Sequence, residues 1–278
     1  MIKAGKNFII IGIFLTVIAF ILVGFNIRKF IDDIKATSTY EEKVFEYEYN
    51  NNIKKIEIVT KNVKITIKES KSNTIKIEYF ENRDAKFEVY TKNNTLYFKE
   101  KTIFRFINFD LASLFENTNI TVYIPNESYE ELSINNTNGG ITFENIKKLE
   151  FENIDLSTSN GRIELNEVIA DDISIKTSNG RIDISEVTSK KIYAKSSNGS
   201  LNLYDTISKD IELKTSNGSI NAKIIGNKND YNFELKTSNG KIKLNNNEYS
   251  NKLNENNKSN QDIYAKTSNG SIKINFFE

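Results

Sequence analysis

The stretch DISIKTSNGRIDI, residues 172–184, contains the pattern that decides the fold. Its centre, Thr-Ser-Asn-Gly, occurs five times, and the Asn-Gly pair occurs seven times in the second half of the chain. The seven pairs are Asn138-Gly139, Asn160-Gly161, Asn179-Gly180, Asn198-Gly199, Asn217-Gly218, Asn239-Gly240 and Asn269-Gly270. Successive asparagines are 22, 19, 19, 19, 22 and 30 residues apart. Such a period is typical of a repeat array.

Apolar residues flank every Asn-Gly pair at fixed offsets. Around Asn179 they are Ile173, Ile175, Ile182 and Ile184, and the other copies keep apolar residues at the same places. A spacing of two puts such residues on one face of a β-strand. We therefore predict that each unit is a strand, an Asn-Gly turn, a strand and a second turn. Asparagine and glycine suit a turn because both tolerate positive φ, and no phosphate-binding loop is indicated because no helix follows the glycine.

The first half of the chain keeps a weaker form of this frame. Asn62 and Asn93 are flanked by apolar residues at the same offsets, although the glycine is absent. These flanking residues are Ile56, Ile58, Ile65 and Ile67 for the first, and Phe87, Val89, Leu96 and Phe98 for the second. We predict a degenerate β-repeat region over residues 36–130 and a regular array over 131–278, interrupted by a polar insertion at 245–261.

Two β topologies fit the alternation, a meander of hairpins and a parallel solenoid. The solenoid is favoured because each frame position keeps its residue type from unit to unit, as expected when like stacks on like at about 4.8 Å. The predicted fold is all-β, a right-handed β-helix-like solenoid with repeats of about 19–22 residues. In sequence order, the residues three before each asparagine would then form a column of Ser157, Lys176, Lys195, Lys214, Lys236 and Lys266.

An uncharged apolar segment precedes the array. Phe8–Phe25 has 18 residues, which as a helix would measure about 27 Å, close to the thickness of a bilayer core. A cleaved signal peptide is the alternative, but no small-residue cleavage site follows. We predict that residues 1–35 hold one transmembrane helix that anchors the chain in the cell membrane. The basic residues on its two flanks nearly balance, and for a single amino-terminal anchor we favour an extracytoplasmic β domain.

Composition excludes several functions. The chain has no histidine and no cysteine, so it cannot form a Ser-His-Asp triad, a thiol nucleophile or a histidine metal site. With 38 basic and 37 acidic residues it lacks the positive excess of a nucleic-acid-binding protein. We therefore expect no enzymatic activity, no cofactor, no metal and no nucleic-acid partner.

Two rows of charged residues are candidate sites. Lys176, Lys195, Lys214, Lys236 and Lys266 would form a cationic stripe suited to an anionic wall polymer or lipid headgroups, unless they only keep the sheet soluble. Glu167, Glu186 and Asp205 stand seven residues after their asparagines. If stacked, these carboxylates could bind a cation or act on a sugar; the alternative is that they are solvated turn residues.

Three further segments depart from the rhythm. Ile103–Phe115 is aromatic and has helical spacing, which is consistent with a short helix or a partner-binding loop; we favour a lid that packs over the solenoid. Residues 245–261 are polar and indicate a surface insertion. Phe276 and Phe277 are placed to cap the last coil, because open solenoid ends need covering.

The anchor, the degenerate strands and the T-S-N-G-x-I-x-[IL] units together resemble the putative-adhesin family of membrane-anchored β-strand-repeat proteins, which includes the LiaG-like proteins of Gram-positive bacteria. The resemblance implies a β-helix-like fold and a cell-envelope setting, and it supplies no catalytic residue or ligand. The expected function is a non-enzymatic envelope interaction or envelope-stress module, with another envelope protein or an anionic wall polymer as partner. The alternatives are a carbohydrate-active solenoid enzyme and a scaffold for a membrane signalling complex.

Overall fold

A computed structural model describes residues 41–48, 52–81, 85–101, 118–147 and 149–277. Nearly all of them belong to one compact unit, formed by Glu42–Phe80, Phe87–Thr102 and Asn117–Glu278. Within the described ranges no helix is long and apolar enough to cross a membrane. The predicted anchor at Phe8–Phe25 and the predicted lid at Ile103–Phe115 lie outside the described residues.

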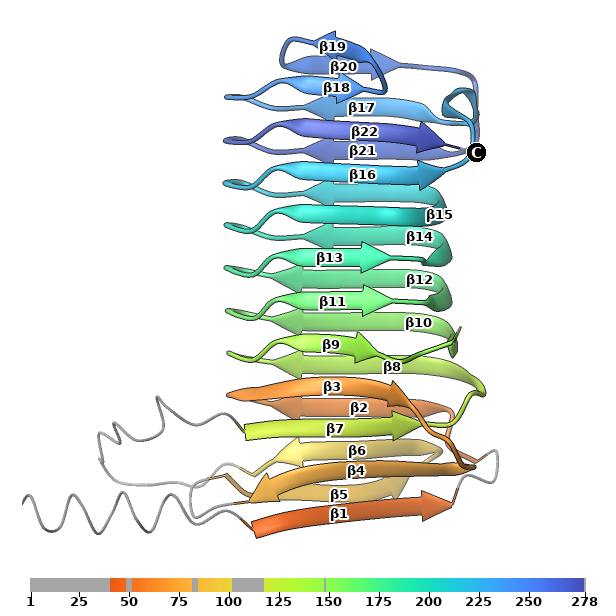
Figure 1. Cartoon of the computed structure of the whole chain (residues 1–278), viewed down its shortest axis with the longest axis vertical. Coiled ribbons are helices and arrows are strands. Elements are labelled where there is room, and N and C mark those ends of the chain that lie inside the picture. Colours follow the sequence, from red (N-terminus) through yellow and green to blue (C-terminus); the bar gives the residue numbers. More distant parts are fainter. Residues whose placement is uncertain (1–40, 49–51, 82–84, 102–117, 148, 278) are drawn as a thin grey trace, which may run out of the picture. The chain divides into compact units, whose positions relative to one another are not determined.

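The unit is a β-solenoid made of two facing sheets (Figure 1). We call sheet B the strands that lead into the Asn-Gly turns and sheet A the strands that follow them. In spatial order, sheet B contains β5 (Phe87–Lys92), β6 (Thr95–Glu100), β2 (Lys55–Thr60), β8 (Ser128–Asn136), β10 (Leu149–Thr158), β12 (Val168–Thr177), β14 (Thr188–Lys195), the second half of β15 (Leu201–Lys214), β21 (Asp262–Lys266), β17 (Asn232–Lys236) and β20 (Lys252–Glu255).

Sheet A faces sheet B and is built in the same way. Its strands in spatial order are β1 (Glu41–Glu48), β4 (Thr74–Glu81), β7 (Thr118–Ile124), β3 (Val63–Glu69), β9 (Ile141–Glu144), β11 (Ile163–Asn166), β13 (Ile182–Ser185), the first part of β15, β16 (Ile220–Ile225), β22 (Ile272–Phe277), β18 (Ile242–Leu244) and β19 (Asn247–Tyr249). The 3-10 turn η2 (Lys228–Asp230) lies between β16 and β17.

The register confirms the solenoid and rejects the hairpin meander. Ile173 pairs with Ile154 on one side and with Ile192 on the other, both in parallel. Ile175 pairs with Ala194 of the next coil and not with Ile184 across the turn. Like therefore stacks on like, as the constant frame predicts.

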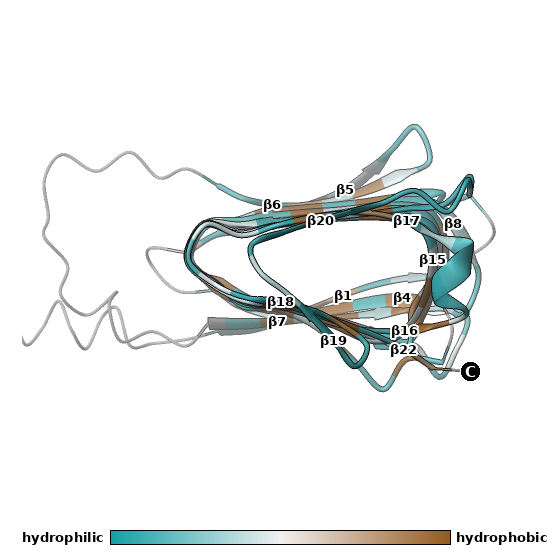
Figure 2. Cartoon of the chain, turned by 90° about the horizontal axis from the view of Figure 1, so that it is seen from above, coloured by the Kyte–Doolittle hydropathy of each residue, from teal (hydrophilic) through white to brown (hydrophobic). Residues whose placement is uncertain are grey.

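The core lies between the two sheets, which are joined along both edges when viewed along the stack (Figure 2). Inward positions alternate with outward ones, so β12 has the burial pattern of a one-sided strand. Ile182, Ile184 and Ile192 are fully buried. Burying each such side chain contributes about 1.5–3 kcal/mol, and this repeats in every coil.

Spatial order departs from sequence order at both ends of the stack. The first coil, β2–β3, lies between the coils β6–β7 and β8–β9. The last coil, β21–β22, lies between β15–β16 and β17–β18. The expected stacking in strict sequence order is therefore wrong at these two places (Figure 1).

The end caps also differ from the prediction. Phe276 and Phe277 belong to β22 and so lie inside the stack, where the Phe276 ring is 5.3 Å from that of Tyr231. The insertion 245–261 supplies β19 and β20, which pair antiparallel with β18 and β17 and cover the outermost coil, β17–β18. A segment expected to be a surface insertion is thus the cap, and it removes an open parallel edge.

Candidate functional site

The Asn-Gly turns form one edge of the solenoid, which we call the Asn-Gly edge. Their asparagine side chains stack into a continuous ladder, in which each amide Nδ2 donates to the Oδ1 of its neighbour at 2.5–2.7 Å. In spatial order the ladder contains Asn62, Asn138, Asn160, Asn179, Asn198, Asn217, Asn269 and Asn239. The degenerate Asn62 unit is therefore part of the same column.

The reason for glycine at this edge is not the one predicted. Among the described residues, positive φ occurs at Asn93, Asn94 and a few other places, but at none of the seven Asn-Gly pairs. Instead, a Cβ on Gly180 would lie 1.7 Å from the carbonyl oxygen of Gly161 in the preceding coil. The turn glycines are required because consecutive backbones approach too closely for any side chain.

The threonine of Thr-Ser-Asn-Gly ties each turn to the coil before it. Thr177 Oγ1 accepts the Gly180 amide at 3.1 Å and donates to the Gly161 carbonyl at 3.2 Å. Ser196 makes the same two bonds with Gly199 and Gly180. Because this hydroxyl is buried, its bond to the Gly161 carbonyl helps to hold the two coils in register, and the bond it accepts from the Gly180 amide fixes its own turn.

The Asn93 frame is the exception. Asn93 and Asn94 have φ of 50° and 60°, and the strands β5 and β6 on either side pair antiparallel. This turn is a β-hairpin of the kind that positive φ favours, and not a solenoid corner. The prediction of a stacked unit around Asn93 is therefore wrong.

The predicted lysines do form a column beside the Asn-Gly edge, on the outer face of sheet B. In spatial order they are Lys176, Lys195, Lys214, Lys266 and Lys236, and Lys252 of the cap continues the column. We call these six residues the lysine column. Its order differs from the sequence because β21 lies between β15 and β17.

Few carboxylates neutralise the lysine column. Lys214 forms an ion pair with Glu212, and the hydrogen bond between the two side chains raises the pKa of Lys214 above its ordinary value. The other five lysines are exposed and have no carboxylate within 4 Å among the described residues. Neighbouring strands lie about 4.8 Å apart, and two ammonium groups at that distance would repel by about 0.9 kcal/mol in water before salt screening. An anion bound along the lysine column would therefore reduce the repulsion between the lysine side chains.

The acidic row lies on the opposite edge, in the second turns. Glu167, Glu186 and Asp205 have φ of 56°, 54° and 50°, so each occupies a left-handed turn position. Backbone hydrogen bonds join the Glu167 and Glu186 turns to the coils that follow them. In the described part of the chain no group of three or more acidic side chains is placed to hold a metal ion. Their observed role is that of turn residues.

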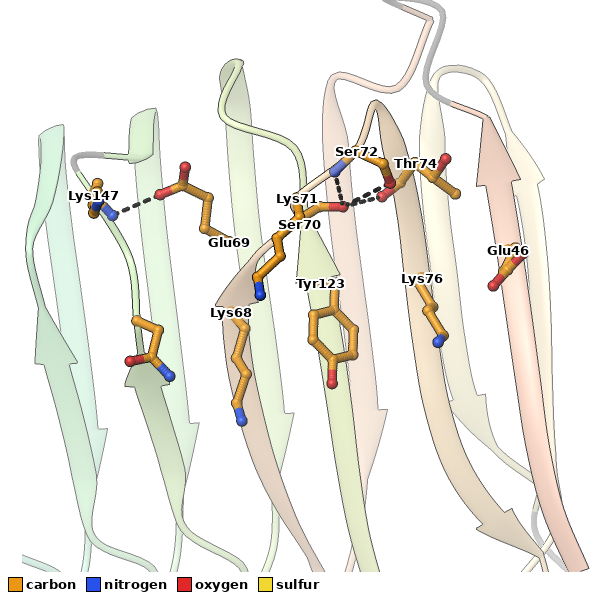
Figure 3. A pocket seen from close by; sticks show the side chains of 11 residues that line it. Glu46, Lys68, Glu69, Ser70, Lys71, Ser72, Thr74, Lys76, Tyr123 and Lys147 are labelled. Atoms are coloured by element: carbon orange, nitrogen blue, oxygen red, sulfur yellow. Dashed lines mark hydrogen bonds between the residues drawn. The ribbon is translucent and has the colours of Figure 1, made fainter.

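A hollow of about 860 Å³ on the outer face of sheet A was not predicted (Figure 3). We call it the β3–β4 hollow, because the turn between these strands forms its rim. Its charged and aromatic lining comes from Glu46, Lys68, Glu69, Lys71, Lys76, Tyr123 and Lys147. These residues come from five parts of the chain, so no sequence motif joins them. The only local signal is the polar turn SKSN at residues 70–73.

Hydrogen bonds fix part of this lining. Glu78 accepts from Lys76 at 2.8 Å and from the Tyr123 hydroxyl at 3.0 Å. The bond to Lys76, with a smaller effect from Tyr123, holds the pKa of Glu78 below its usual range. Burial, followed by the bond to Glu78, raises the pKa of Tyr123. Glu78 is therefore ionised at neutral pH, and Lys76 is held against the sheet.

The family of the chain is given by its sequence. The sequence profile of the Toastrack DUF4097 family matches residues 53–248 and, in a second alignment, residues 175–275. The chain belongs to this family. The first match begins two residues before β2 and includes the crossed first coil, so the degenerate half belongs to the family domain as much as the regular repeats do.

Several solved structures resemble this Toastrack chain at low identity. A "putative cell adhesion protein" of Clostridium sporogenes ATCC 15579 is 12% identical, with 86% of this chain and 100% of that chain covered and a TM-score of 0.35. A "putative adhesin" of Bacteroides fragilis NCTC 9343 is 12% identical over 84% and 97%, with a TM-score of 0.41. A "putative lipid binding protein" of Parabacteroides distasonis ATCC 8503 is 14% identical over 87% and 98%, with a TM-score of 0.39. No curated protein matches the chain.

Proposed function

We propose that this Toastrack protein is a membrane-anchored, extracytoplasmic, LiaG-like and non-enzymatic envelope protein that binds an anionic polymer along its Asn-Gly edge. The observation that carries the proposal is the lysine column, in which five exposed ammonium groups have no carboxylate partner among the described residues. The six lysines span about 24 Å along the stack, at about 4.8 Å for each strand. An extended polyanion lying parallel to the stack would contact all of them at once.

Uncharged donors beside the column support the same ligand class. Between the lysines and the asparagine ladder runs a column of exposed or half-exposed serines, Ser178, Ser197, Ser216, Ser268 and Ser238. Hydroxyl groups and asparagine amides next to ammonium groups suit phosphate or carboxylate oxygens, because charge-assisted hydrogen bonds to such groups are strong. The edge thus offers three parallel columns of donors.

The proposal is tested by charge reversal in the full-length protein. The triple change Lys176→Glu, Lys195→Glu and Lys214→Glu should reduce retention on immobilised polyphosphate at least tenfold at low salt. The difference should shrink as salt rises, because attraction between exposed charges is screened beyond about 10 Å at 0.1 M ionic strength. Equal retention of wild type and variant would reject the column as a binding surface.

A matched control separates alignment from net charge. Lys64, Lys258 and Lys273 are exposed, lie outside the column and form no ion pair among the described residues. Reversing these three gives the same net charge as the test variant, and retention should fall less than twofold. An equal loss in both triple variants would mean that net charge, and not the column, determines retention.

The non-enzymatic part of the proposal has its own test. The changes Glu167→Gln, Glu186→Gln and Asp205→Asn together should leave polymer retention unchanged, because these side chains lie on the opposite edge. Release of sugar fragments from wall material by the wild type, lost in this acidic triple variant, would overturn the proposal in favour of a hydrolase.

A further inference from the structure

The β3–β4 hollow exists because the chain leaves the repeat at this point. After β3 the chain does not make a second turn into the next coil; it crosses beyond β7 and returns as β4, antiparallel to β7. The turn at residues 70–73 therefore stands above the outer face of sheet A and walls a hollow about 860 Å³ in volume. In the middle of the stack the strands of sheet A, such as β11, β13 and β15, pair in parallel and in register (Figure 1).

Two ammonium groups at the rim have no carboxylate partner in the described part of the chain. Lys68 and Lys76 are paired with Glu144 at 3.4 Å and with Glu78 at 2.8 Å. Lys71 and Lys147 are exposed and lack a carboxylate within 4 Å among the described residues. They approach the hollow from different turns, β3–β4 and β9–β10, so the fold and not the sequence brings them to one site.

The rest of the lining is suited to hydroxyl groups and to a small apolar surface. Ser72, Thr74 and Asn145 contribute hydroxyl and amide groups, and the carboxylate of Glu69 already accepts the Lys147 amide at 2.8 Å. The Tyr123 hydroxyl is used by Glu78, so the tyrosine presents its ring to the hollow rather than a free donor. Figure 3 shows this ring between Lys68 and Lys76, beneath the turn that carries Lys71.

We propose that the β3–β4 hollow is a second binding site, separate from the lysine column, for a phosphate-bearing polyol or sugar. Lys71 and Lys147 bind the phosphate as point charges, since lysine is a common phosphate ligand. The carboxylate of Glu69 and the nearby hydroxyls bind the ligand's hydroxyl groups, and the Tyr123 ring packs against its carbon atoms. Hollows of this size take a ligand of one or a few such units.

Glycerol 1-phosphate is the probe for this site. Isothermal titration of the full-length protein should show saturable binding, at least fivefold tighter than inorganic phosphate and much tighter than glycerol. Absence of saturable binding, or glycerol 1-phosphate binding no better than inorganic phosphate, would overturn the proposal. Inorganic phosphate supplies the charge and glycerol the hydroxyls, so this comparison tests whether both are recognised together.

The double variant Lys71→Ala and Lys147→Ala should weaken glycerol 1-phosphate binding at least tenfold. Both side chains are exposed, so thermal unfolding should be unchanged, and this measurement verifies that the variant is folded. The matched control Lys64→Ala and Lys273→Ala removes the same charge elsewhere and should change the affinity less than twofold. Equal weakening in both variants would show a non-specific charge effect and reject the site. Polyphosphate retention through the lysine column should be the same in both variants, so the two proposals fail independently.

Discussion

The middle of the solenoid and its two ends obey different rules. From β10 to β16, each coil stacks on the coil that precedes it in the sequence, asparagine bonds to asparagine, and each turn glycine lies against the turn glycine of the coil before. At both ends the terminal coil is placed one step inward and its neighbour becomes outermost. The exposed edges are then closed by antiparallel strands, β1, β4 and β5 at one end and β19 and β20 at the other.

This difference shows how a repeat protein can end without an open parallel edge. A terminal coil held between two others pairs on both sides, so fraying of the chain end does not expose the stack. The outermost strands are short or polar, as expected for edges that must not pair with another molecule. The irregular ends also provide the β3–β4 hollow, whereas the regular middle provides the lysine column.

The largest expected effect tests the close contact in the middle. Gly180→Ala places a Cβ 1.7 Å from the Gly161 carbonyl oxygen, so the two coils must separate or the turn must refold. We expect a loss of at least about 3 kcal/mol in the free energy of unfolding, measured by urea denaturation, because neither backbone can yield alone.

Gly226→Ala is the control from an irregular region. Gly226 follows β16 where the chain leaves the repeat; its φ is +139°, and a Cβ there would meet nothing within 4 Å. This change should cost about 1 kcal/mol, from backbone strain only. A loss at Gly226 equal to that at Gly180 would contradict the distinction between glycines needed for close approach and glycines needed for φ.

A smaller effect compares the interior of the asparagine ladder with its end. Asn179 donates to Asn160 and accepts from Asn198, whereas Asn239 is the last member and donates to Asn269. Asn179→Ala should cost about 1–2 kcal/mol and Asn239→Ala about half as much, at about 1 kcal/mol for each hydrogen bond. Urea denaturation of the two single variants measures this, and a larger loss at Asn239 would show that the ladder is not the stabilising element.

The sequence predicted the middle well because one pattern determines both the strand and its inward face. Ile173 and Ile192 occupy the same position in their repeats, and both are buried in the core. The spacing of the apolar residues alone therefore predicted that these two residues pair between neighbouring strands. Stacking order at the ends could not be predicted, because Ile263 and Phe233 occupy the same frame position and either can follow Ile211.

The sequence also did not predict which turns need positive φ and which need a glycine for close contact between coils. Asn93-Asn94 and Asn179-Gly180 look alike as turn signals, yet one is a hairpin with positive φ and the other a close contact between coils. The lysine column follows from spacing, apart from its order. The β3–β4 hollow does not, because Lys71 and Lys147 are distant in sequence and line the same hollow only through the crossed first coil.

The smallest expected effect concerns charge at the end that contains the hollow. The pKa of Glu78 is below its ordinary value of 4.5, chiefly through its hydrogen bond to Lys76. A carboxylate with a lowered pKa stabilises the folded state fully above the unfolded value, and this contribution is lost as pH falls through the folded value. We therefore expect a slight loss of stability below pH 4.5, limited because the pair is partly exposed.

Carbon-detected NMR titration of the glutamate carboxyls measures this effect directly. In the Lys76→Ala variant the pKa of Glu78 should rise toward 4.5, although Tyr123→Phe should raise it less, because the tyrosine hydrogen bond is the weaker cause. Glu248 at the opposite end has its pKa lowered by Lys241 and Lys243, and both variants should leave it unchanged. An unshifted Glu78 in the Lys76→Ala protein would mean that Lys76 is not held against the sheet. Lys76 would then be free to bind the phosphate itself, so its alanine variant would weaken glycerol 1-phosphate binding as strongly as the loss of Lys71 does.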